Sequence, residues 1–223
     1  NCSGIVSWLN TLPLFFEVAV HHVLFMSNHI HMLVTPKRDN MGQAMSYFLT
    51  NLSKFLNFKN GRINHTFGHR YTPTIIAHKQ HLMNVIRYIY QNPVRAGLVR
   101  KIDDYPFSSL GFYLGHSNTG FIVSPDSFTN ELFSLGLDGS EAWCKNLCAV
   151  LSTDDAQQVR RSLTRSIYNH SVSQMKFILE NDSGLSLWKK WVCPASSLPP
   201  YITLHIKQNQ KNAWAAAKNV IQL

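Results

Sequence analysis

The chain has 223 residues, of which 45% are hydrophobic and 15% are charged, and its formal net charge at pH 7 is +9. This balance is typical of a globular protein and argues against a disordered or fibrous chain. No apolar run approaches the roughly 18 residues that a membrane span needs, and the N-terminal residues lack the pattern of a secretory signal. We therefore expect a soluble cytoplasmic protein with no membrane partner.

The positive charge is concentrated in the first half of the chain. Residues 1–116 contain 11 Lys and Arg against 4 Asp and Glu, whereas residues 117–223 contain 10 against 8. Between positions 40 and 102 there is no acidic residue, and the basic residues are Lys54, Lys59, Arg62, Arg70, Lys79, Arg87, Arg95, Arg100 and Lys101. A field of one sign suits a polyanionic partner. The charge therefore favours contact with nucleic acid over the alternative of a solvated basic surface.

The first expected elements are a helix and a β-hairpin. Apolar residues at helical spacing cover positions 5–17, where Pro13 interrupts the pattern. Apolar stretches at 18–26 and 29–35 indicate two antiparallel strands that the tight turn Ser27-Asn28 connects.

A long helix and a short strand are expected next. Apolar spacing predicts a helix from Met41 to Lys59, with Gly61 as its C-cap. A strand over residues 71–77 should lie at an edge of the sheet, because Pro73 has no N–H to donate to a neighbouring strand.

A second long helix is predicted over residues 79–92, with Pro93 ending it. The small, polar segment 115–120 is the expected domain boundary. We therefore expect a first domain of residues 1–116 and a mostly helical C-terminal extension of residues 117–223. Within the extension, the pattern predicts helices at 127–135, 141–151, 153–168, 173–180 and 212–221, with a Pro-containing segment before the last.

Two histidines stand in the second strand of the hairpin, within the stretch "MSNHIHMLV". Residues i and i+2 of a strand point to the same face, so His29 and His31 can chelate one divalent ion. The alternative is a pair of surface histidines on a half-exposed strand. Other histidine pairs, such as His21 with His22, are expected to be structural because no cysteine or second ligand pair accompanies them.

The helix before Pro93 carries two further candidates. Tyr88 and Asn92 are four residues apart and share one helical face. The Asn92 carboxamide oxygen could complete a metal site with the two histidines, and a tyrosine beside a metal and cations can attack phosphorus. The alternative is that Tyr88 packs in the core and Asn92 caps the helix.

Four motifs in this order, "MSNHIHMLV", "GHRYTPTIIA", "RYIYQNPVRAGLV" and "DDYPFSSLGFYLG", resemble those of the REP-associated tyrosine transposases, a branch of the single-tyrosine HUH transposases. The resemblance covers roughly residues 15–115. It implies an α+β fold, an antiparallel sheet backed by helices and similar to ferredoxin or RNA-recognition folds. It also implies an enzyme that cuts and rejoins single-stranded DNA next to hairpins.

The resemblance also implies roles for individual residues. His29, His31 and Asn92 correspond to the metal ligands, for Mg²⁺ or Mn²⁺, and Tyr88 to the nucleophile that forms a 5′-phosphotyrosine. Arg70, Arg87 and Arg95 lie in or beside the matching motifs and are expected to contact DNA. The C-terminal extension favours a monomer, with a dimer as the alternative.

The sequence also departs from the family pattern. The family's first strand, with its Asn-Arg-Gly segment, has no counterpart before the first helix. We expect either that the sequence is truncated or that the sheet lacks a strand. Two other functions stay open: a catalytically silent nucleic-acid-binding protein derived from such a transposase, and a metal hydrolase of small phosphate esters.

Overall fold

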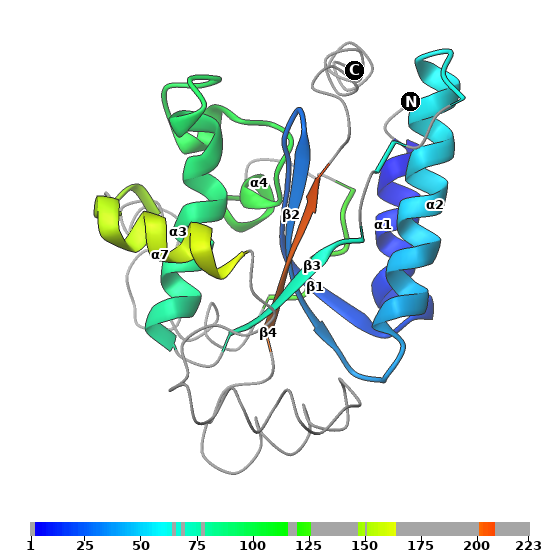
Figure 1. The fold of residues 1–223 in the computed structure, drawn as a ribbon, viewed down its shortest axis with the longest axis horizontal. Coiled ribbons are helices and arrows are strands. Elements are labelled where there is room, and N and C mark those ends of the chain that lie inside the picture. The colour runs from blue at the N-terminus through cyan, green and yellow to red at the C-terminus, as the bar shows by residue number, and fades with distance from the viewer. Residues whose placement is uncertain are drawn as a thin grey trace.

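A four-stranded antiparallel sheet lies at the centre of the structure, a computed structural model (Figure 1). The residues it describes are 3–63, 66–67, 70–76, 79–115, 120–125, 147–149, 151–163 and 201–207. In the order in which they lie in the sheet, the strands are β1 (Val18–Phe25), β2 (His29–Pro36), β4 (Tyr201–Lys207) and β3 (Thr72–Ile76).

Helices cover both faces of this sheet (Figure 1). One layer contains α1 (Ser3–Phe15) and α2 (Met41–Lys59), and the other contains α3 (Lys79–Arg95), the short 3-10 helix η1 (Ile102–Asp104), α4 (Leu110–Tyr113) and α7 (Thr153–Ser162). The expected α+β class, an antiparallel sheet backed by helices, is confirmed. Among the described residues, no helix combines the length and apolarity needed to cross a bilayer.

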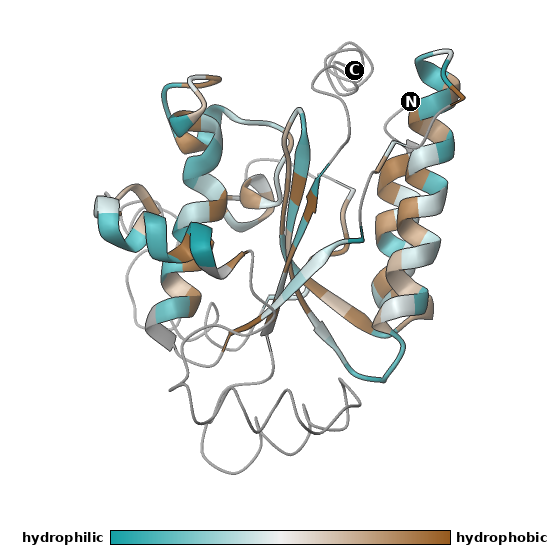
Figure 2. Cartoon of the chain, viewed as in Figure 1, coloured by the Kyte–Doolittle hydropathy of each residue, from teal (hydrophilic) through white to brown (hydrophobic). Residues whose placement is uncertain are grey.

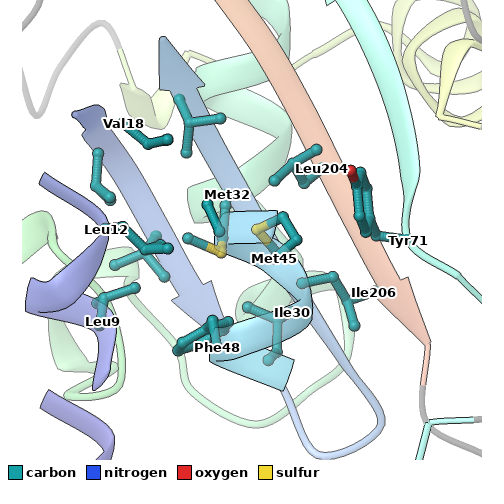
Figure 3. Packing of buried hydrophobic residues seen from close by; sticks show 14 of the residues in the cluster. Leu9, Leu12, Val18, Ile30, Met32, Met45, Phe48, Tyr71, Leu204 and Ile206 are labelled. Carbon is teal, nitrogen blue, oxygen red and sulfur yellow. The ribbon is translucent and has the colours of Figure 1, made fainter. Parts of the chain in front are cut away.

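The core between the sheet and the α1/α2 layer follows from the alternation of apolar residues along the strands. Ile30 and Met32 of β2 meet Met45 and Phe48 of α2, and all four side chains are fully buried (Figure 3). Each such side chain contributes about 1.5–3 kcal/mol when it leaves water. In Figure 2 the strands β1 and β2 are largely hydrophobic, whereas α7 is mainly hydrophilic.

A β-bulge lets β1 keep its apolar residues on one face. The register with β2 shifts between Val20 and His22. One extra residue reverses the alternation of side chains, so Val20 before the bulge and Val23 after it both pack toward α1 and α2. His22 points to the other layer, where its Nδ1 lies 2.7 Å from the Tyr90 hydroxyl. The structural interpretation of His21 and His22 fits these buried positions.

Strand β4 is an element that the sequence analysis missed. It lies between β2 and β3 and pairs antiparallel with both. The signal was the alternation in "YITLHIK", in which Ile202, Leu204 and Ile206 enter the core. Whether the sheet lacks the family's first strand stays untested, whereas β3, with Pro73, takes the predicted edge position.

The sequence predicted that Pro93 would end α3, but it does not. The helix continues to Arg95, because the proline ring disturbs the preceding turn while its fixed φ still suits a helix. Gly97, with φ +66°, ends it: the N–H groups of Gly97 and Leu98 donate to the carbonyls of Val94 and Pro93. Helix α2 has the predicted bounds, and Gly61, with φ +60°, caps it in the same way.

Segments beyond residue 116 pack against the first 116 residues. They include β4 in the sheet and α7, whose Val159 is buried in the α3 layer. The helix predicted over 153–168 is confirmed for residues 153–162. Residues 147–148 of the helix predicted over 141–151 are helical, whereas 127–135, 173–180 and 212–221 lie outside the described residues. The division of the chain at residue 116 stays a prediction.

Candidate metal centre

Three histidines from two neighbouring strands form a cluster on the sheet face that carries α3. His31 of β2 and His205 of β4 are directly paired, and His29 stands two residues before His31 on the same face. The ring centroids are 4.6 Å apart for His29 and His31, 5.0 Å for His29 and His205, and 4.8 Å for His31 and His205. One nitrogen of each ring lies within 4.8 Å of the others, which suits a shared metal ion.

Burial keeps these imidazoles neutral at pH 7. It lowers the pKa of His29 to about 4, helped by the charge of Lys207, and that of His205 to about 3, helped by His29 and Lys207. It also holds the pKa of the fully buried His31 well below its ordinary value. Only an unprotonated imidazole offers a lone pair to a metal, so the cluster is in its binding form at neutral pH.

Two asparagines hold the outer nitrogens of the cluster. Nδ1–H of His29 donates to Oδ1 of Asn28 at 2.6 Å, which leaves the His29 Nε2 lone pair available. Nδ2 of Asn92 donates to Nε2 of His31 at 2.8 Å. If the Asn92 amide turns by 180°, its Oδ1 accepts from Nε2–H instead, and Nδ1 of His31 is then free for a metal. Nδ1 of His31 lies 3.4 Å from Nδ1 of His205, which is the side where a shared ion would be.

Tyr88 lies against this cluster. Its ring centroid is 5.8 Å from that of His31, edge to face, and the guanidinium of Arg95 lies 5.1 Å from the centre of the tyrosine ring. Burial raises the pKa of the Tyr88 phenol, while the charges of Arg95 and Arg160 oppose that shift. Helix α3 places Tyr88, Asn92 and Arg95 on one side because residues three and four apart share a helical face.

The sequence-predicted ligands and nucleophile therefore meet at one place. His29, Tyr88 and Asn92 line a pocket of about 530 Å³ beside the cluster, and Arg95 lines it as well. His31 is fully buried beneath them. Comparisons with protein-family models, curated proteins and solved structures find no match for this chain.

Two predicted DNA-contacting arginines do not line this pocket. Arg70 is exposed, and its guanidinium lies 5.3 Å from the ring centre of Tyr71 and beside Gly42 at the start of α2, in the other helical layer. Arg87 precedes Tyr88 on α3 and is half-buried. Their contact with DNA stays a prediction.

The sequence analysis missed His205 as a member of the cluster. A single histidine in the last strand, 174 positions from His31, carries no motif by itself. The available signal was indirect: the alternation in "YITLHIK" puts His205 on the polar face of a strand. Its register with β2 depends on the fold.

Proposed function

We propose that this protein is a metal-dependent single-stranded DNA endonuclease and strand transferase that acts next to hairpins, similar to the REP-associated tyrosine transposases. The observation that carries the proposal is the position of the Tyr88 ring, 5.8 Å from His31 in a cluster of three neutral imidazoles. A phenol beside a metal-binding cluster and two arginines suits attack on a phosphodiester.

His29, His31 and His205 would hold the ion. Asn28 would fix the orientation of the His29 ring, and Asn92 that of the His31 ring. A donor set of three imidazoles fits a first-row transition metal, whereas Mg²⁺ takes mainly oxygen ligands. Of the two ions expected from the sequence, we therefore propose Mn²⁺ rather than Mg²⁺. A divalent ion held there would supply a Lewis acid that polarises the scissile phosphate.

The proposed reaction uses the Tyr88 hydroxyl as nucleophile. Its oxygen forms a bond to phosphorus, the bond from phosphorus to the 3′ oxygen breaks, and the 5′ end of the DNA becomes a phosphotyrosine. The phenolic proton passes to solvent water, and the departing 3′ oxygen takes up a proton from solvent water to give a free 3′-OH. Arg95, stacked on the ring, favours the phenolate that burial disfavours. The phosphotyrosine conserves the bond energy, so rejoining needs no ATP.

A covalent-adduct assay tests this proposal. The protein is incubated with Mn²⁺ and hairpin DNA that has a single-stranded tail and a label at its 3′ end. Denaturing gels then report the labelled DNA that is linked to the protein. We expect an adduct with the unaltered protein and at least about a thousandfold less with Tyr88→Phe, because the nucleophilic oxygen is lost. Shifted bands in native gels without any adduct would instead identify a catalytically silent DNA-binding protein.

Tyr90→Phe is the matched control for that assay. Tyr90 lies two residues along the same helix, but its hydroxyl is buried and lies 2.7 Å from His22 Nδ1 and 2.9 Å from Ser109 Oγ. We expect this variant to keep the adduct while losing about 1–3 kcal/mol of stability, since it removes buried hydrogen bonds to His22 and Ser109. An adduct lost only in Tyr90→Phe would move the nucleophile to Tyr90.

A further inference from the structure

Three cationic side chains of the described residues line the pocket beside Tyr88. Arg95 comes from α3, Arg160 from α7 and Lys207 from β4, and none of the described residues that line the pocket is acidic. Two of the three cations therefore come from the part of the chain beyond residue 116, whose role the sequence did not decide.

These cations lie close enough to act on the groups in the pocket. The guanidinium of Arg95 lies 5.1 Å from the centre of the Tyr88 ring, and Arg160 lines the same pocket as Tyr88. Lys207 pairs with His29 in the sheet register and lines the same pocket. All three cationic side chains thus line the pocket that Tyr88, His29 and His205 also line.

No anion within the described part of the chain neutralises this group. The ion pair between described residues joins Arg38 to Glu17, neither of which lines the pocket. Within the described residues, Arg95, Arg160 and Lys207 form no ion pair. Like charges gathered around one pocket repel each other, and a bound anion would relieve that repulsion. A volume of about 530 Å³ lies within the roughly 300–1,000 Å³ typical of ligand pockets.

We propose that Arg95, Arg160 and Lys207 form a cradle for the backbone phosphates of a single DNA strand, so that α7 and β4 supply part of the substrate site. The assignment of the anion to DNA rests on the proposed function. Helix α7 is suited to this task because the Ser152 hydroxyl accepts from the Asp155 N–H and fixes its start. Its last turn then presents Arg160 to the pocket.

The test measures the salt dependence of DNA binding by fluorescence anisotropy. The probe is a 5′-fluorescein-labelled 20-nucleotide oligo(dT), and the full-length protein carries Tyr88→Phe and is kept in EDTA, so that neither cleavage nor metal contributes. In this background Arg160→Gln is compared with Arg161→Gln, which removes the same charge from the next position of α7 and does not line the pocket. Both arginines lie in the last turn, so any effect on the helix dipole is shared.

We expect Arg160→Gln to weaken binding several-fold and to reduce the slope of log K against log[salt] by about 0.7, the value for one contact to single-stranded DNA. Arg161→Gln should keep the slope of the background protein, and Arg160→Lys, which retains a point charge, should restore most of it. Thermal melting of each variant checks that it is folded.

An unchanged slope in Arg160→Gln, equal slope losses in Arg160→Gln and Arg161→Gln, or no binding of oligo(dT) by the background protein would each overturn the cradle. These outcomes are separate from the adduct assay. A Tyr88-dependent adduct with an unchanged slope would leave the proposed function standing without the cradle, whereas a reduced slope without an adduct would leave a phosphate-binding pocket without the chemistry.

Discussion

At the scale of single residues, hydrogen-bond partners decide which imidazole nitrogens can bind a metal. Asn28 accepts from Nδ1–H of His29, and the Asn92 amide lies 2.8 Å from Nε2 of His31. Such outer contacts fix the tautomer and the orientation of a ligating histidine. Asn92, expected from the sequence as a ligand, is placed where it can orient His31, and His205 is the third imidazole.

Removing the third imidazole should weaken metal binding strongly. We expect His205→Ala to lower the affinity for Mn²⁺ by more than the roughly 10–100-fold that losing an outer-sphere partner costs. Isothermal titration calorimetry measures the affinity, and Asn92→Ala provides the comparison within that 10–100-fold range. Unchanged affinity in His205→Ala would remove His205 from the proposed centre.

The buried histidines also predict a pH dependence of stability without metal. The pKa of His29 is about 4 and that of His205 about 3 in the folded protein, below the ordinary 6.5. Between these values the unfolded chain binds more protons than the folded chain, so the free energy of unfolding rises with pH. Above pH 6.5 the two histidines are neutral in both states and give no pH dependence. Below pH 6.5 the free energy of unfolding falls as the pH drops toward 4.

Urea denaturation in EDTA at pH 7.5 and at pH 5 measures this effect. We expect a lower urea midpoint at pH 5, and a smaller difference in His205→Gln, which has one titrating group fewer. A midpoint that is equal or higher at pH 5 would contradict the neutral state of the cluster.

At the scale of elements, the end of α3 depends on a glycine rather than on the proline before it. Gly97 has φ +66° and nothing lies near the position of an added Cβ. The cost of Gly97→Ala is therefore one of backbone conformation, about 1 kcal/mol of stability. Tyr88 and Arg95 lie in the last two turns of α3, next to this C-cap.

Gly42→Ala is the matched control for that prediction. Gly42 lies in the first turn of α2 on an exposed face, and an added Cβ would come no closer than 4.0 Å to the Arg70 guanidinium. In a helix, alanine is favoured over glycine, so we expect a stabilisation of up to about 1 kcal/mol. Urea denaturation of both variants should therefore give free-energy changes of opposite sign, and two changes of the same sign would contradict the assigned backbone conformations.

At the scale of the whole molecule, β4 joins the two ends of the chain in one sheet. Its residues lie between β2 and β3, and Leu204 is fully buried against the α1/α2 layer (Figure 3). The sheet, the core and the imidazole cluster thus depend on a segment more than 120 positions beyond β3. Folding of this sheet must close a long loop before β4 can pair.

Truncating a core side chain of β4 should therefore destabilise the entire protein. We expect Leu204→Ala to cost about 2–5 kcal/mol, the usual range for a leucine removed from a packed core. Leu14→Ala, at a position of α1 that is 62% exposed, should change stability by about 0.5 kcal/mol or less. Equal urea midpoints for the two variants would show that β4 is not part of the cooperative fold.

The two residue pairs of the site that lie close together in the sequence were predictable because their signals are local. The two-residue period of a strand puts His29 beside His31, and helical spacing puts Tyr88 beside Asn92. The edge position of β3 followed from Pro73, which lacks an N–H, and the end of α2 from Gly61. These inferences needed only neighbouring residues.

The tertiary structure alone decided how these local pairs combine. The register of β2 with β4 brings His205 opposite His31, and the packing of α3 and α7 brings Arg95 and Arg160 to one pocket. Sequence spacing carries no information about such pairings, because strand register and helix packing are set by which apolar faces can be buried together. Local periodicity by itself determined the chemistry available on each element, and burial of the shared core determined where that chemistry meets.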